Sequence, residues 1–177
     1  AAWMIALSGP IVDLFRGGSF NRVDAADTAQ YFAIFAISLA LWTSQGIYAR
    51  AFYASRNTLT PAVAGSIITL LSIPVYHFFF HAVGMAGLAI ASDAGILTHT
   101  VTLAILLDRR RLVPISGLEG GELARSLLAG VVSFAGTAAM ARYVHLSRGH
   151  LGDVLVIATA SVVWIALCWG ALMLTGS

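Results

Sequence analysis

Long apolar runs separated by short polar segments dominate the pattern of the chain. Residues 28–49, 57–92, 126–141 and 154–177 contain no Asp, Glu, Lys or Arg. A helix needs roughly 20 apolar residues to cross a bilayer core about 30 Å thick. The runs are continuously apolar and do not alternate with a period of two, so the pattern favours transmembrane helices over a β-barrel.

The charge-free runs predict five complete spans and the end of a sixth. We expect the five at residues 29–49, 61–81, 84–107, 124–144 and 154–175, and the end of the sixth at residues 1–15. Thr60 and Pro61 are typical of a helix N-cap followed by a first-turn proline, and Pro74 is expected to kink its span. The predicted fold class is all-α, a polytopic transmembrane helix bundle.

Small residues recur at i, i+4 spacing in the fourth of these spans. The pairs are Ser126 with Gly130 and Ala135 with Ala139. Small residues at this spacing let helix backbones approach closely in a membrane. Such pairs permit close packing of helices, which indicates a helix bundle but does not say which one.

The composition excludes several classes of protein. Of the 177 residues, 59% are hydrophobic and only 10% are charged, against about 25% charged in soluble domains. The net charge of +2 is too small for a nucleic-acid-binding surface. The single cysteine, Cys168, excludes a disulfide framework and is expected to be an inert thiol in the membrane.

The arginines in the short connections predict the orientation in the membrane. One side collects six arginines and the other collects four, and cytoplasmic loops are enriched in basic residues. The first group is Arg50, Arg56, Arg109, Arg110, Arg111 and Arg125, and the second is Arg16, Arg22, Arg142 and Arg148. The connections at 50–60 and 108–122 are therefore expected to be cytoplasmic, as is the C-terminus.

Two polar residues within the third span are candidates for function. Asp93 lies near mid-depth, where an acid costs about 2.5–3.5 kcal/mol on insertion scales, so a partner or water is expected. It can line a cation, proton or substrate path, or it can make a structural hydrogen bond between helices. His99 lies about 120° around the helix from Asp93, whereas Thr100 shares the face of Asp93. Histidine at such a position is more often an interhelical hydrogen bonder than a ligand.

Two further pairs have a functional and a simpler interpretation. His77 and His81 have metal-binding spacing, but the aromatic residues around them indicate an interfacial belt. Arg50 and Arg56 flank Phe52 and Tyr53 at a helix end. These arginines either reach lipid headgroups or contact a phosphorylated lipid substrate. No paired carboxylates, nucleophile triad or phosphate loop is present, so we expect no enzyme, no catalytic residue, no metal and no cofactor.

Three blocks of sequence resemble the MurJ/MviN family. The first is the run SGPIVDLFRGGSF at residues 8–20, and the third is GMAGLAIAS at 84–92 with the DRRR that ends at 111. The second, RAFYASRNTLTP at 50–61, is similar to that family's "RAFYA…DT.TP" loop, with Asn57 in place of the usual aspartate. Its signature residues here are Phe52, Tyr53, Thr58, Thr60 and Pro61.

The resemblance implies a lipid II flippase of peptidoglycan synthesis in the bacterial inner membrane. The chain would be the C-terminal part of such a protein, within the second of two lobes that work by alternating access. Residues 1–111 would supply core helices of that lobe, and 112–177 two additional helices. The implied partners are a lipid-linked substrate of the undecaprenyl-pyrophosphate type, membrane lipids and the missing N-terminal lobe. The candidate substrate or cavity residues are Asp93, His99, Arg50 and Arg56.

Alternatives to a lipid II flippase stay open at this point. They are another exporter of the same superfamily, for polysaccharide-lipid or drugs, and a non-transporting scaffold of the cell-wall machinery. The arginines that bind pyrophosphate in this family lie mainly in segments that the chain does not contain, so no substrate-binding residue follows from a motif.

Overall fold

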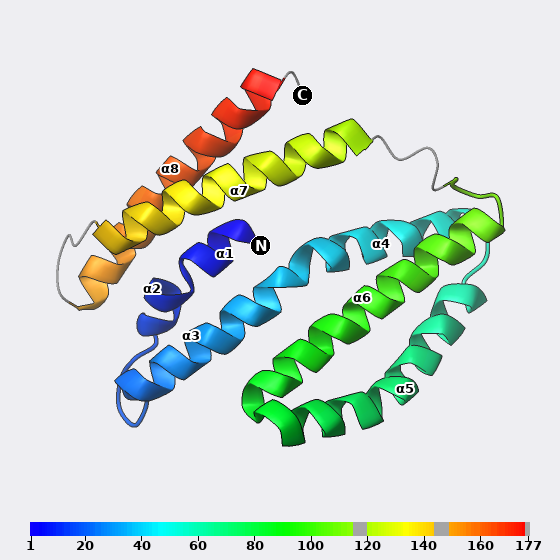
Figure 1. Ribbon diagram of the computed structural model, residues 1–177, viewed down its shortest axis with the longest axis horizontal. Coiled ribbons are helices and arrows are strands. Elements are labelled where there is room, and N and C mark those ends of the chain that lie inside the picture. Colours follow the sequence, from blue (N-terminus) through cyan, green and yellow to red (C-terminus); the bar gives the residue numbers. More distant parts are fainter. Residues whose placement is uncertain (115–119, 144–148, 176–177) are drawn as a thin grey trace. The chain divides into compact units, whose positions relative to one another are not determined.

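A computed structural model describes residues 1–114, 120–143 and 149–175, and these are helical with short connections (Figure 1). Five helices in this part of the chain are long and apolar enough to cross a membrane, which confirms the predicted number of complete spans. The helices are α1 (Ala2–Ala6), α2 (Ser8–Asp13), α3 (Arg22–Ile37), α4 (Leu39–Ala54), α5 (Leu59–Val83), α6 (Met85–Arg109), α7 (Gly120–Tyr143) and α8 (His150–Thr175).

Helices α3 and α4 together form the first long span, with a turn at Ser38 between them. The start of α3 is a reciprocal cap that the sequence analysis did not identify. The Asn21 side chain accepts from the amide of Val23 at 2.7 Å, and the Asp24 carboxylate accepts from the amide of Asn21 at 3.0 Å. These two bonds satisfy amides that a helix N-terminus leaves without partners.

The segment predicted to be the end of a sixth span contains two short helices, α1 and α2, separated at Leu7. Pro10 explains the break, because proline has no amide hydrogen and its ring clashes with the carbonyl four residues earlier. That this segment belongs to a sixth span stays a prediction. Pro74, by contrast, lies within the continuous helix α5, whose axis changes direction along its length (Figure 1).

By packing, the chain divides into two compact units, residues 37–118 and residues 1–36 with 119–177. In the first unit, α4 and α5 each pack on α6, which lies between them (Figure 1). In the second unit, α7 packs along α8, α1 lies against α7, and α2 lies against α8. The proposed division into core helices 1–111 and additional helices 112–177 stays a prediction.

The hairpin of α5 and α6 turns within a single residue. Gly84 has φ +68°, which glycine adopts without steric cost. Three residues later, a Cβ on Gly87 would lie 2.0 Å from the carbonyl oxygen of Phe79. The backbones of the two helices therefore meet at Gly87, and only glycine fits there.

Helix α7, which packs against α8 and α1, buries a row of small residues. Buried positions on α7 are Ala129, Ser133 and Thr137, whereas Ser126, Ala135 and Ala139 are exposed. Gly130 is half-buried, so the positions that α7 buries are not the small-residue pairs named from the sequence. The stripe at 129, 133 and 137 has the same i, i+4 spacing, so spacing alone did not distinguish the two faces.

Candidate functional site

A polar groove within unit 37–118 contains the strongest candidate site. Helix α6 places His99 between α4 and α5, where its Nδ1 lies 3.0 Å from the side-chain nitrogen of Gln45 on α4. The ring reaches α5 because position 65 is glycine, where a Cβ would lie 3.1 Å from the His99 ring. Two hollows of about 330 and 310 Å³ are both lined by His99, Gln45 and Trp42.

Two atoms of this groove are buried without a hydrogen-bond partner, His99 Nε2 and Gln45 Oε1. The amide nitrogen of Gln45 donates to Nδ1, so a neutral His99 carries its proton on Nε2. The groove thus presents one free donor and one free acceptor. Buried polar atoms without partners are costly, and more so in a membrane, so a polar ligand or water is the expected occupant.

Asp93 lies elsewhere on α6 and has a different partner. Ser38, which is buried at the turn between α3 and α4, donates a hydrogen bond to its carboxylate. Thr100 faces the same part of α4 and contacts the carbonyl of Leu41 at 3.2 Å. Asp93 therefore has the partner expected of an acid in a span, and it shares its direction with Thr100 rather than with His99. Its second oxygen, Oδ1, is buried without a partner.

The signature loop at 50–61 is a helix end built on a buried phenylalanine. Phe52 is fully buried and packs with Ala64, Leu103 and Leu107. Its carbonyl accepts from the amide of Asn57 at 3.0 Å, and Arg56 has φ +59°. This is the Schellman arrangement, in which the chain leaves the helix through a left-handed residue.

The end of α6 repeats this geometry next to that of α4. Arg111 has φ +56°, and the amide of Leu112 donates to the carbonyl of Leu107 at 3.0 Å. Phe52 and Leu107 occupy equivalent positions in the two motifs and lie in the same core cluster. Two helices thus end side by side, each with an arginine where glycine is the usual residue.

The remaining signature residues form the start of α5. The predicted N-cap at Thr60 is wrong, because α5 begins at Leu59 and Pro61 is its third residue. Instead, the side-chain oxygen of Asn57 accepts from the amide of Thr60 at 3.1 Å. An aspartate can make the same bond, so Asn57 preserves the local geometry. Pro61 is buried, whereas Arg50, Tyr53, Arg56 and Thr58 are exposed.

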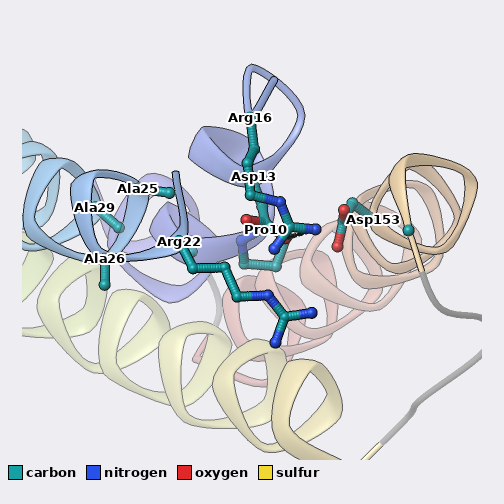
Figure 2. Close-up of a pocket in the computed structure, with 10 residues that line it drawn as sticks. Pro10, Asp13, Arg16, Arg22, Ala25, Ala26, Ala29 and Asp153 are labelled. Atoms are coloured by element: carbon teal, nitrogen blue, oxygen red, sulfur yellow. Dashed lines mark ion pairs between the residues drawn. The ribbon is translucent and has the colours of Figure 1, made fainter. Parts of the chain in front are cut away.

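A second site, which the sequence analysis missed, lies in the other unit (Figure 2). A hollow of about 720 Å³ is lined by the charged residues Asp13, Arg16, Arg22 and Asp153 and by small residues of α3. Arg16 pairs with Asp13 at 3.2 Å, and Asp153 Oδ2 is buried without a hydrogen-bond partner. Asp153 is far from the other three charged residues in the sequence, and in the sequence all four are ordinary charges near helix ends.

The other predicted residues are not brought into either site. His77 and His81 are exposed, with ring centroids 4.4 Å apart in edge contact. Arg142 lies at the end of α7, and Arg148 lies outside the described residues.

Comparison with known proteins decides the family. The family model described as lipid II flippase MurJ matches residues 1–160. The chain belongs to the MurJ family. This places the signature loop and the groove on α6 within a MurJ sequence, and it confirms the resemblance of the three blocks.

Individual relatives of the MurJ family match over a shorter length. A probable lipid II flippase MurJ of Thermotoga maritima is 27% identical over 103 residues, 58% of this chain and 22% of that protein. A lipid II flippase MurJ of Thermosipho africanus is 30% identical over 53% of this chain and 20% of that protein. A probable lipid II flippase MurJ of Synechocystis sp. is 25% identical over 77% of this chain and 26% of that protein. The chain thus spans about a quarter or less of the relatives that it matches.

Proposed function

We propose that the chain forms part of the second lobe of a lipid II flippase in the bacterial inner membrane. The observation that carries this proposal is the match of a MurJ model to residues 1–160, in a chain whose described part has five helices long and apolar enough to cross a membrane. The substrate would be a lipid-linked peptidoglycan precursor of the undecaprenyl-pyrophosphate type. Its headgroup crosses the membrane while its tail stays in the bilayer, so no covalent chemistry and no enzyme activity are needed.

The mechanism we propose is alternating access, in which this lobe rocks against an N-terminal lobe about a central site. An ion gradient or the membrane potential would drive the cycle, since the potential is worth about 2.3 kcal/mol per charge per 100 mV. The groove of His99 and Gln45 supports a role in this path, because it offers unpaired polar atoms within a membrane span. Asp93 is a second candidate for this path.

The proposed orientation places the ends of α4 and α6 in the cytoplasm. Helices α4 and α6 run in the same direction, and α5, which connects them in the sequence, runs in the opposite direction. The arginines at the C-terminal ends of α4 and α6 therefore lie at the same end of this unit. Arg50 and Arg56 are then candidates for contact with a phosphorylated headgroup on the cytoplasmic side. The charged hollow of Asp13, Arg16, Arg22 and Asp153 would face outward.

The test is complementation of a flippase-depleted bacterium with the full-length gene. We expect restored growth and lipid II exposed on the outer face of the membrane. Deletion of residues 124–177 from the full-length protein should abolish this activity, and residues 1–177 alone should not transport. Immunoblots of membrane fractions establish that each protein is present. A full-length protein that is present in the membrane but exposes no lipid II contradicts the proposal.

A further inference from the structure

An apolar groove runs along the α5–α6 hairpin and has none of the residues His99, Gln45 and Trp42 in its lining. It has a volume of about 570 Å³, and Leu59, Val63, Ile67 and Leu71 line it from α5. These side chains are between 46% and 71% exposed. Helix α6 contributes Thr98, Thr102, Leu106 and, at one end, Arg110.

The threonines do not make this groove polar. The hydroxyl of Thr98 donates to the carbonyl of Ala94 at 2.8 Å, and that of Thr102 donates to the carbonyl of Thr98 at 2.7 Å. Because both hydroxyls are bonded to their own helix, the walls present mainly methyl and methylene groups away from Thr60, which lies at the same end of the groove as Arg110. The occupant of the long part of the groove must therefore be apolar.

The length of the groove matches one leaflet of a bilayer. Leu59 and Leu71 are twelve residues apart, which is about 18 Å along a helix at 1.5 Å per residue. Half of a hydrocarbon core of about 30 Å is about 15 Å. A smaller hollow of about 110 Å³, lined by Ser72 and Val75, continues the groove beyond Leu71. An acyl chain that starts at the membrane surface fits this space.

The residues at the mouth of the groove carry an excess of positive charge, which favours a lipid with an anionic headgroup. At this end of the unit, residues 50–60 and 106–114 contain five arginines and one acid, Asp108. Arg110 lines the groove itself and is exposed at the end of α6. A guanidinium at the level of the headgroups binds phosphate, and each such charge favours an anionic lipid.

We propose that this groove is a binding site for an anionic phospholipid of the surrounding leaflet, with one acyl chain along α5 and the phosphate at Arg110. The apolar walls, the length of one leaflet and the excess of arginine at one end all fit this occupant. The lipid is a component of the bilayer and not the transported substrate.

The test uses the purified full-length protein with phosphatidylglycerol or phosphatidylcholine added, and native mass spectrometry to count the lipids retained. We expect phosphatidylglycerol to be retained more strongly, and Arg110→Gln to lower its apparent affinity about fivefold, the effect of one charge at a membrane surface. Arg109→Gln is the matched control, because Arg109 carries the same charge at the same helix end but does not line the groove. It should retain phosphatidylglycerol more strongly than Arg110→Gln.

A second pair of variants tests the apolar part. Thr102→Phe should fill the groove and reduce retention even with Arg110 present, whereas Val101→Phe, next to it but outside the groove, should not. Equal retention by Arg110→Gln and Arg109→Gln, or by both phenylalanine variants, overturns the proposal. Equal binding of phosphatidylcholine, or displacement of phosphatidylglycerol by equimolar undecaprenyl phosphate, also overturns it.

Discussion

The side-chain nitrogen of Gln45 lies 3.0 Å from Nδ1 of His99, although 54 residues separate them in the sequence. This contact joins α4 to α6 within the membrane span and leaves one polar atom on each side chain without a partner. A hydrogen bond between membrane helices is worth about 0.6 kcal/mol on average and up to about 1.7 kcal/mol. The hydrogen bond itself therefore contributes little to stability, and the two atoms without partners are available to bind a ligand.

The first prediction concerns this pair in the full-length protein. Gln45→Leu and His99→Phe should show a coupling energy of about 0.6–1.7 kcal/mol in a double-mutant cycle of unfolding. Each variant should lower transport severalfold, because a donor or an acceptor is lost from the groove. Thr43→Val is the control, since the Thr43 hydroxyl bonds only its own helix. Full transport by both variants contradicts a role for the groove in the substrate or ion path.

The second prediction concerns the contact at Gly87. Gly87→Ala should destabilise the full-length protein by about 1–3 kcal/mol, because the new methyl group meets the backbone of Phe79 and forces the helices apart. Gly46→Ala, where the added Cβ meets nothing within 4 Å, should be neutral or stabilising by up to about 1 kcal/mol. Thermal unfolding of both variants measures the difference. Equal melting temperatures for the two variants are incompatible with the close approach of α5 and α6.

The third prediction concerns the left-handed arginines. Arg56→Gly should stabilise the protein by about 1 kcal/mol, because a side chain at positive φ costs roughly 1–2 kcal/mol. Arg50→Gly, within helix α4, should destabilise it by about 1 kcal/mol. Both changes remove one charge, so chemical or thermal unfolding separates backbone strain from charge. A loss of transport in the more stable Arg56→Gly variant would indicate that the guanidinium at this position has a function.

The fourth prediction concerns the charged hollow of Figure 2. Asp13→Asn removes the ion pair with Arg16, and because both side chains are partly exposed, stability should fall by less than about 1 kcal/mol. If the hollow takes part in transport, activity should fall by more than this small change in stability accounts for. The control is Glu122→Gln, which removes an exposed ion pair with Arg125 on α7. Equal transport by the two variants limits the hollow to a structural role.

The sequence was sufficient for the spans and for the family, because both depend on local or contiguous signals. A charge-free apolar run of about 20 residues is long enough to cross a bilayer, and it indicates a transmembrane helix without any tertiary information. The motif at 50–61 is likewise contiguous, and its residues form one helix end and the next helix start. The exact caps were less predictable, because Asn57 rather than Thr60 supplies the capping oxygen.

The sites required the tertiary structure, because their members come from different helices. Gln45 carries no charge and lies in an apolar run, so nothing in its neighbourhood indicated that His99 would meet it. Asp13 and Asp153 are ordinary acids at helix ends until packing places them around one hollow. On α7, several sets of small residues have the same i, i+4 spacing, and only packing against other helices decides that Ala129, Ser133 and Thr137 are the buried set. Sequence thus determined which segments enter the membrane, and the side-by-side packing of distant helices decided where their polar atoms are left without partners.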